Sequence, residues 1–339
     1  MKRIILYILA IIATTFFAII VFVFAASRAV PEGAEEVIEQ VMSEELPNQI
    51  LGDSGRVESN GVELWYESIQ PAGNAKGTIL LIMGLGGNAV EWPLYFIQPL
   101  VDSGYQVIRF DNRGTGLSTW VDEAFTMRDM ADDALTVMDG LDVASAHVLG
   151  LSMGGMIAQL MAIENPERVQ TLISFMSSGY MDDPDLPSIS QSDFITFVAT
   201  GIRHGIIRTE RNVLRATIAM RKIMATELSE KRMRTLAEQG LFNLRYRKGF
   251  NPNAFILQTQ AIRNAGSRYE GLSKLEVPTL VIHGKADPLI PVEHGIKTAE
   301  VTPNAELLLI EDMGHDVGPE QTVQIHKAVL EMIGRERRF

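Results

Sequence analysis

The sequence of 339 residues contains no cysteine. That absence excludes disulfide bonds, thiolate metal sites and a cysteine nucleophile, although it does not identify the compartment, because a protein without disulfides can occur in any of them. Basic residues are also few, since 30 Lys and Arg stand against 42 Asp and Glu and give a net charge of −12. A nucleic acid backbone attracts basic proteins, so we expect no nucleic acid partner.

Apolar residues, by contrast, are plentiful. They make up 46% of the chain, against 21% charged residues, which excludes a disordered protein. A chain of this length can bury a large core, as one large domain or as two. Neither internal repeats nor low-complexity tracts interrupt it.

The longest apolar run lies near the N-terminus. Ile4–Ala26 is 23 residues long and carries no charge. As a helix it would measure about 34 Å, against a hydrocarbon core of about 30 Å. Lys2 and Arg3 precede the run, whereas six Glu follow within residues 32–45, so the positive-inside rule keeps the amino end in the cytoplasm. Residues 1–28 are therefore predicted to be a single-pass membrane anchor, with the rest of the chain on the extracytoplasmic side.

The alternative for the same run is a signal peptide that is removed on export. Ala25 and Ser27 are small enough for a cleavage site. The apolar region of a signal peptide, however, is about 7–15 residues long, and this run is longer. The length favours the anchor, and an exported protein without an anchor is the alternative.

Short apolar runs alternate with segments of helical period in residues 55–179 and 274–339. Such runs are typical of buried parallel strands, and the alternation predicts an α/β core with helices on both faces of one sheet. Before them, the Asn60-Gly61 turn between "RVES" and "VELWYESI" predicts a hairpin. The expected parallel strands are Thr78–Met83, Gln106–Phe110, Ala146–Leu149, Thr171–Met176, Thr279–Ile282 and Leu307–Ile310.

Two segments differ from this pattern. Residues 29–54 are acidic and contain Pro31 and Pro47, so they are expected to be a linker, either a spacer or a loosely packed helix. Residues 180–273 have helical periods but no convincing strand, which predicts an inserted helical lid. Within the lid, residues 201–250 hold 12 Lys or Arg and 4 Asp or Glu, so we expect the basic side chains either to pair with acidic patches or to face an anionic surface.

A glycine-rich stretch, "MGLGGNA", directly follows the first of the expected parallel strands. Gly84 to Ala89 fits G-x-G-x-x-A, the turn that holds a dinucleotide pyrophosphate, and Asp111 follows at about the distance of an acid that binds the ribose. The same backbone could instead direct its amides at a reacting carbonyl oxygen, as half of an oxyanion hole. The stretch thus leaves a cofactor site and a hydrolase site as alternatives.

The sequence "GLSMG" places Ser152 in a G-x-S-x-G motif between an expected strand and an expected helix. A serine on such a sharp turn takes strained backbone angles, and the flanking glycines remove side chains that would clash. The turn presents the hydroxyl at the amino end of a helix, where developing negative charge is stabilised. Ser118 in "GLSTW" is the nearest alternative, but it lacks the second glycine and follows no strand directly.

A serine hydroxyl needs a base, and the base needs an orienting acid. Asp287 in "HGKADPLIP" lies just past an expected strand, and His315 in "MGHDV" lies just past the next one, which is the chain order that this kind of serine requires. Of the six histidines, only His315 follows the acid, follows a strand and sits in a glycine-containing loop. A dinucleotide site would leave these three residues in the correct order by coincidence, which favours the hydrolase.

Over residues 56–339 the chain resembles the α/β-hydrolase superfamily. The matching pieces are "GLSMGG", "FDNRGTGLST", "HGKADPLIP" and "MGHDV", and the chain is most similar to the lid-bearing esterase and methylesterase branch of bacterial hydrolases. The resemblance implies a mostly parallel eight-stranded sheet with helices on both faces and an inserted lid. It also implies that Ser152 is the nucleophile, Asp287 the acid and His315 the base, with the amides of Leu85 and Met153 as the oxyanion hole. A departure is Met83, which stands where many relatives carry histidine.

These features together predict a serine hydrolase that cleaves a carboxylic ester through an acyl-enzyme on Ser152, without a cofactor or a metal. The expected partner is a small acyl substrate of apolar character, because the lid is rich in hydrophobic residues. Relatives on this fold also cleave lactones, amides and carbon–carbon bonds, so these reactions are alternatives, as is a receptor-like module that only binds a ligand. The complete triad favours the enzyme.

Overall fold

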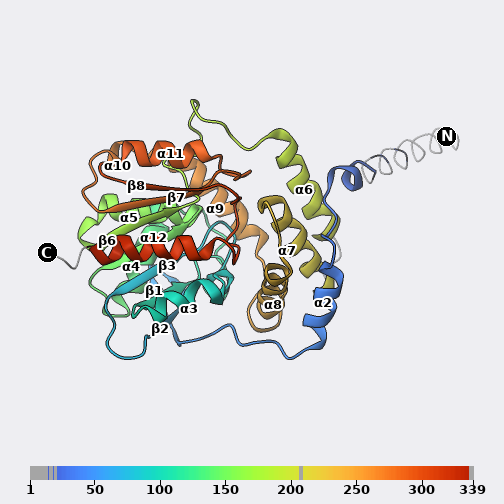
Figure 1. Ribbon diagram of the computed structural model, residues 1–339, viewed down its shortest axis with the longest axis horizontal. Helices are drawn as coiled ribbons and strands as arrows, with labels where there is room; N and C mark the ends of the chain where they lie inside the picture. The colour runs from blue at the N-terminus through green and yellow to red at the C-terminus, as the bar shows by residue number, and fades with distance from the viewer. Residues whose placement is uncertain (1–13, 15–17, 19–20, 206–208, 336–339) are drawn as a thin grey trace.

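The computed structural model describes residues 14, 18, 21–205 and 209–335. Their core is one eight-stranded sheet with the strand order β1-β2-β4-β3-β5-β6-β7-β8 (Figure 1). Strand β2 pairs antiparallel with β1 and β4, and all other neighbours are parallel, so the predicted mostly parallel sheet is confirmed. The strands are β1 (Asp53–Ser59), β2 (Val62–Ile69), β3 (Thr78–Ile82), β4 (Gln106–Phe110), β5 (Ala146–Leu151), β6 (Val169–Phe175), β7 (Thr279–Gly284) and β8 (Glu306–Ile310).

The antiparallel edge begins with the predicted hairpin. Asn60 and Gly61 join β1 to β2 with φ angles of 49° and 81°. Two successive positive φ values twist a two-residue turn in the sense that the flanking strands need. The turn sets the register in which Val57 lies opposite Leu64.

Helices cover both faces of the sheet, as the alternating pattern predicts. The central strand β3 is buried along its whole length, because a hydrophobic cluster lies on each side of it. One face is covered by α3 (Leu94–Asp102) and α12 (Thr322–Arg335), and the other by α4 (Met127–Asp139), α5 (Met153–Glu164) and α10 (Tyr269–Leu272), while α11 (Val292–Val301) packs against β7 and β8. The carboxyl ends of the parallel strands are left open for loops.

Of the described helices between β6 and β7, α10 packs on the core, and the four that precede it lie in the segment that the sequence predicts to be a lid; they are called the lid helices below. They are α6 (Gln191–Gly205), α7 (Glu210–Met224), α8 (Glu230–Tyr246) and α9 (Pro252–Asn264). Figure 1 shows them beside the sheet, with α7 and α8 between the core and an N-terminal helix, α2 (Ala34–Ser43).

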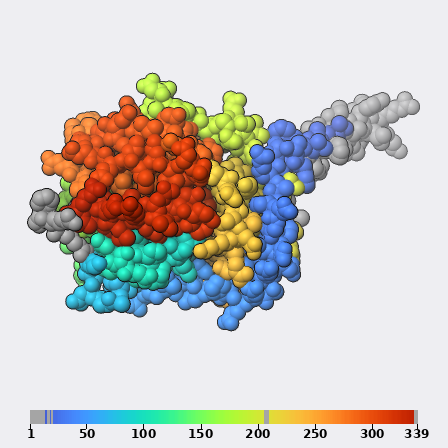
Figure 2. All heavy atoms as spheres, viewed as in Figure 1, coloured from blue at the N-terminus to red at the C-terminus, as the bar shows by residue number. Residues whose placement is uncertain are grey.

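Helix α2 lies within the segment that we expected to be an acidic linker. Its apolar side chains, Val37, Ile38 and Val41, are almost completely buried in a cluster with residues of α7 and α8, and Figure 2 shows the N-terminal segment covering the outer side of the lid. The helix is therefore more tightly packed than a spacer, because one of its faces completes a hydrophobic core that the lid helices cannot close alone.

The acidic face of α2 and the residues just after it neutralise part of the lid's positive charge. Glu35 lies 2.7 Å from Arg215, and the carboxylates of Glu39 and Glu44 also contact lid guanidinium groups. The ion pairs are Glu35–Arg215, Glu39–Arg211 and Glu44–Arg234. Several of the lid's basic residues thus have acidic partners from a segment more than 150 residues away in the sequence.

Among the described residues, no helix is both long and apolar enough to cross a membrane. The predicted anchor, Ile4–Ala26, lies largely outside the described residues, which include only Thr14, Ala18 and residues 21–26 of it. The structure therefore gives no support to the predicted transmembrane helix.

Candidate active site

Ser152 stands between the end of β5 and the start of α5, as the motif predicts. Its φ and ψ are 56° and −119°, a backbone conformation that residues other than glycine rarely adopt. The amide of Ser152 donates a hydrogen bond of 2.8 Å to the carbonyl of Phe175, at the end of the neighbouring strand β6. The turn is thus held by the sheet in a strained conformation, as a nucleophile elbow is.

The two glycines of the motif are required by close backbone approaches. A Cβ atom on Gly150 would lie 2.0 Å from the carbonyl oxygen of Gly154, and a Cβ on Gly154 would lie 2.1 Å from that of Ile82. Real Cβ atoms do not approach backbone oxygens so closely. The strand-to-helix turn can therefore form only if both positions lack a side chain.

Asp287 and His315 meet at the carboxyl ends of β7 and β8. His315 Nδ1 lies 2.6 Å from Asp287 Oδ2, and both side chains are buried. The other carboxylate oxygen, Oδ1, accepts hydrogen bonds of 2.9 Å from the amides of Leu289 and Ile290. The carboxylate is fixed by these amides, and it in turn fixes the orientation of the imidazole ring.

The environment of Asp287 favours its charged form. Burial by itself raises the pKa of this carboxyl, but the charge of His315 and hydrogen bonds from His283 and His315 overcome that effect and hold the pKa well below its usual range. His283 Nε2 lies 3.5 Å from Asp287 Oδ2 and also 2.8 Å from the carbonyl oxygen of Ile290. The acid is therefore ionised at neutral pH and can stabilise a positive charge on His315.

The hydroxyl of Ser152 is not yet engaged with the base. Within the described part of the chain, no hydrogen bond joins Ser152 Oγ to His315. Contacts between a nucleophile and its base are often long without a substrate and shorten in the complex, so a missing hydrogen bond is compatible with such a pair. The alternative serine is fully engaged elsewhere, because Ser118 Oγ donates to the carbonyl of Asp111 at 2.7 Å and accepts from the amide of Trp65 at 2.9 Å.

The glycine-rich loop after β3 runs directly beside Ser152. A Cβ on Gly84 would lie 3.2 Å from the Cβ of Ser152. The amide of Gly86 is held by Gln258 Oε1 at 2.8 Å, whereas the amides of Leu85 and Met153 have no acceptor within the described residues. Met153 is the first residue of α5, so its amide has no partner within the helix. Two free amides next to a serine hydroxyl are the arrangement that an oxyanion hole requires.

The acid after β4 supports this loop and is not free to bind a ribose. The carboxylate of Asp111 is completely buried, accepts hydrogen bonds from the amides of Ala89 at 2.9 Å and Leu117 at 2.7 Å, and pairs with Arg247 of the lid. Its neighbour Asn112 donates to the carbonyl of Met83 at 3.0 Å. The geometry therefore favours the hydrolase site over the dinucleotide site.

The sequence interpretation missed the residues that the lid contributes beneath the site. Gln258 of α9 is completely buried and binds both the amide of Gly86 and, at 3.2 Å, the carbonyl of Arg113. A glutamine on the apolar face of "AFILQTQAI" was the signal that could have identified it, because a buried amide needs polar partners. Which backbone groups it meets depends on how the lid docks, which the sequence pattern does not reveal.

Comparison with known proteins agrees with this geometry. The family model described as the alpha/beta hydrolase fold matches residues 77–321. Rhodomycin D methylesterase DnrP of Streptomyces peucetius is 32% identical over 280 residues, which cover 76% of this chain and 91% of that protein. A 2-hydroxy-6-oxononadienedioate/2-hydroxy-6-oxononatrienedioate hydrolase of Cupriavidus pinatubonensis is 27% identical over 262 residues, covering 76% and 86%.

A solved structure extends the likeness in fold to nearly the whole chain. It is described as a membrane phospholipase A and a bacterial virulence factor, and it aligns with a TM-score of 0.63 and 22% identity over 98% of this chain and 99% of its own. The strained serine elbow, the Asp–His pair and the family match over most of the sequence all lead to the same assignment. The chain belongs to the α/β hydrolase fold family, and the two relatives named above are a methylesterase and a dienedioate hydrolase.

Proposed function

We propose that this protein is a serine hydrolase that cleaves a carboxylic ester through an acyl-enzyme on Ser152. The observation that carries the proposal is the 2.6 Å contact between His315 and the ionised Asp287, at the same sheet edge as the strained turn of Ser152. An oriented imidazole next to a serine hydroxyl is the arrangement that activates this weak nucleophile.

We propose the following steps for these groups. Ser152 Oγ attacks the carbonyl carbon while His315 Nε2 accepts the hydroxyl proton, and the amides of Leu85 and Met153 donate to the oxygen that becomes negative. As the tetrahedral intermediate collapses, His315 gives the proton to the departing alkoxide. A water molecule then attacks the acyl-enzyme, with His315 accepting its proton and returning it to Ser152. Asp287 keeps its charge throughout and stabilises the protonated imidazole.

The methylesterase similarity supports an ester as the substrate, since that relative is 32% identical over most of its length. We propose a small acyl substrate of apolar character, and neither a cofactor nor a metal is needed for these steps. Carbon–carbon cleavage is the second candidate, because a dienedioate hydrolase is 27% identical over a similar span.

We further propose that Ile4–Ala26 anchors the protein in a membrane with the catalytic domain on the extracytoplasmic side, while export after signal cleavage is the alternative. The uncharged run of 23 residues supports the anchor. So do the contacts at the end of the run and just after it, where the Arg203 guanidinium lies 4.8 Å from the ring centre of Phe24 and the amide of Arg28 donates to Thr200 Oγ1 at 2.9 Å. These contacts give the segment around a candidate cleavage site a role in packing against α6.

A substrate panel with the purified full-length protein in detergent tests the chemistry. We expect hydrolysis of p-nitrophenyl esters, with a preference among acyl chains of different length, and loss of that activity in Ser152→Ala. A vinylogous 1,5-diketone, which is a substrate for hydrolysis of a carbon–carbon bond, serves as the competing substrate. Turnover of the diketone without turnover of any ester would replace ester hydrolysis by the second candidate, and equal turnover of esters by Ser152→Ala would reject the mechanism.

A further inference from the structure

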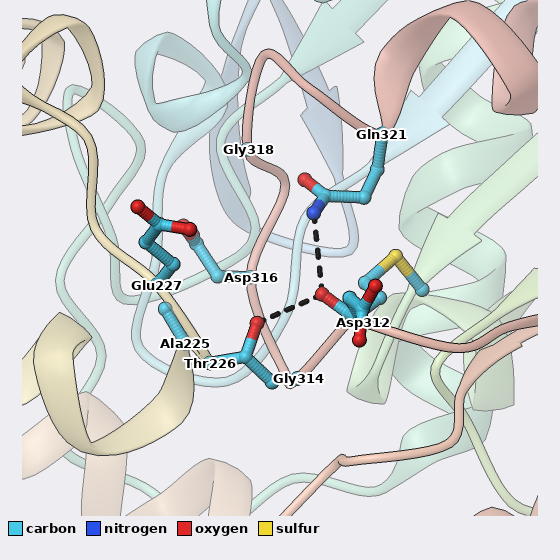
Figure 3. Close-up of a pocket in the computed structure, with 9 residues that line it drawn as sticks. Ala225, Thr226, Glu227, Asp312, Gly314, Asp316, Gly318 and Gln321 are labelled. Atoms are coloured by element: carbon cyan, nitrogen blue, oxygen red, sulfur yellow. Dashed lines mark hydrogen bonds between the residues drawn. The ribbon is translucent and has the colours of Figure 1, made fainter.

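The loop that carries His315 is hydrogen-bonded to the lid on the side where α7 and α8 are joined. A small pocket lies between the connector of α7 and α8 and this loop, and its lining includes neither Ser152 nor His315. Figure 3 shows two side chains converging on the carbonyl of Asp312, the hydroxyl of Thr226 at 2.8 Å and the amide of Gln321 at 3.3 Å. Thr226 thus joins the lid to the second residue of the loop after β8, and Gln321 holds the same carbonyl from the residue just before α12.

The next contact reaches the histidine itself. The amide of His315 donates to the carbonyl of Met224, the last residue of α7, at 2.7 Å. A Cβ on the preceding Gly314 would lie 2.1 Å from the same carbonyl oxygen, so the two backbones pass in direct contact. The main chain of His315 is therefore positioned by a lid residue and not by the sheet alone.

The residue after the histidine, Asp316, forms a buried ion pair with the lid. Arg232 of α8 grips the carboxylate of Asp316 with two hydrogen bonds, Nε to Oδ2 at 2.9 Å and Nη2 to Oδ1 at 2.6 Å. The two side chains are only 3% and 4% exposed, and Arg221 of α7 adds a second positive charge 3.3 Å from Oδ1. Burial raises the pKa of Asp316, but the charges of Arg232 and Arg221 overcome this and lower it, so the carboxylate is ionised at neutral pH.

The core holds the far side of the same loop. Tyr95 of α3 donates a hydrogen bond of 2.7 Å to the carbonyl of Val317. Asp316 lies between the two residues whose backbones are held by these contacts, His315 on the lid side and Val317 on the core side. Its own side chain is fixed by two parallel charged hydrogen bonds from Arg232. A bidentate arginine fixes the plane of a carboxylate as well as its position, which a single charge does not do.

We propose that Arg232 is a positioning residue for His315, which it holds in its productive orientation through Asp316. The inference rests on the proposed function, since it assigns a role in the reaction of the same triad. Asp287 fixes one edge of the imidazole, but the ring's distance from Ser152 depends on the backbone of His315. That backbone lies between Gly314, which contacts the lid main chain, and Asp316, which the lid arginine grips. The lid therefore takes part in the reaction by placing the base.

The competing explanation is that the Arg232–Asp316 pair only attaches the lid to the core. Both explanations predict a loss of folded protein when the pair is broken, because a buried charge is left without its partner. They differ in what happens in the molecules that stay folded. A positioning role changes the geometry of His315 in the folded enzyme, whereas a purely structural role changes only how many molecules are folded.

The experiment compares full-length wild type with Arg232→Met, Arg232→Lys and Asp316→Asn. Arg234→Met is the matched control, because Arg234 lies on the same helix but is 39% exposed and pairs with Glu44 and Glu238. Three quantities are measured: kcat and KM on a p-nitrophenyl ester, the folded fraction by circular dichroism, and the low-field proton resonance of His315 Nδ1–H. The last requires no substrate.

We expect kcat per folded molecule to fall about 10–100-fold in Arg232→Met with KM within about twofold, because a displacement of about 1 Å in a reacting group can cost about 10²-fold. The low-field resonance should shift or broaden in Arg232→Met and Asp316→Asn. Arg232→Lys should recover part of the rate, and Arg234→Met should match wild type in all three quantities.

Wild-type kcat per folded molecule and an unchanged resonance in Arg232→Met would overturn the inference. If Arg232→Met does not fold, the same two outcomes in Arg232→Lys and Asp316→Asn decide it. A failure of the proposed function has a different signature, namely no ester turnover in wild type or equal turnover in Ser152→Ala. The resonance still reports on the positioning of His315 in that case.

Discussion

Asp287 Oδ2 and His315 Nδ1 lie 2.6 Å apart although 28 residues separate them in the chain. They meet because β7 and β8 are parallel neighbours, so the loops after the two strands leave the sheet at the same edge. The other carboxylate oxygen of Asp287 is occupied by two backbone amides. The contact is therefore held from the acid's side.

Replacing Asp287 with Asn should lower kcat by about 10³–10⁴-fold, because the amide group holds the imidazole in the wrong tautomer and cannot stabilise its positive charge. Steady-state kinetics on a p-nitrophenyl ester measure the loss. The matched control is Asp312→Asn, since Asp312 is an exposed acid on the histidine's own loop and its hydrogen bonds to described residues are made by its backbone carbonyl. An Asp287→Asn enzyme with more than a tenth of wild-type kcat would remove Asp287 from the triad.

The lowered pKa of Asp287 also predicts how stability depends on pH. A carboxyl whose pKa is lower in the folded than in the unfolded state stabilises the fold above the unfolded value, about 3.9, and this contribution is lost as the pH falls through the folded value. The free energy of unfolding of wild type and of Asp287→Asn is measured by urea unfolding at pH 6, 4 and 3. The difference between the two free energies should become smaller below pH 4. A gap that stays constant or widens on acidification would contradict the assigned direction of the shift.

A methyl group on Gly154 should abolish activity, because its Cβ would lie 2.1 Å from the carbonyl oxygen of Ile82 and would force the turn of Ser152 out of shape. Gly201 is the matched control, since it is also helical but has no atom within 4 Å of an added Cβ. Gly201→Ala should keep wild-type turnover and gain about 0.5–1 kcal/mol of helix stability. Turnover by Gly154→Ala near the wild-type level would show that the elbow tolerates a different geometry.

Helix α2 should contribute to stability mainly through its apolar face. Ile38 is completely buried between α2 and the lid helices, so Ile38→Ala is expected to lower the free energy of unfolding by about 2–5 kcal/mol. Glu35→Gln on the opposite, exposed face should change it by less than about 1 kcal/mol, even though Glu35 pairs with Arg215. Chemical unfolding of the full-length protein measures both. An Ile38→Ala protein as stable as wild type would mean that α2 does not dock in solution.

The proposed topology predicts that a reporter active only after export works when it is fused beyond residue 30. The mature protein should keep Met1 or a residue next to it, which mass spectrometry of the amino-terminal peptide can determine. A new amino terminus near Ser27 or Arg28 would establish the exported protein without an anchor. A reporter that stays inactive would reject both forms of export.

The amino-acid sequence by itself determined the features of this protein that depend on residues close together in the chain. The elbow of Ser152 follows from a buried strand, two glycines and a helix in immediate succession, and the hairpin follows from Asn60 and Gly61. The parallel strands, with their bounds to within two residues, follow from short runs of apolar residues. The order of Ser152, Asp287 and His315 could be read from the chain because each lies just past a strand, and parallel strands bring such positions to one edge.

Only the tertiary structure decided how the lid and the N-terminal segment contact the core. Arg232 and Asp316 are 84 residues apart, and Glu35 and Arg215 are 180 apart. Neither member of either pair carries a sequence signal that identifies its partner, because a charged residue in a helix or a loop looks the same whether it faces water or an oppositely charged side chain. The Arg232–Asp316 pair forms because several elements dock together and exclude water, and the exposed Glu35–Arg215 pair forms because α2 docks on the lid helices. The partners in both pairs are therefore fixed by packing over the whole molecule and not by the local sequence.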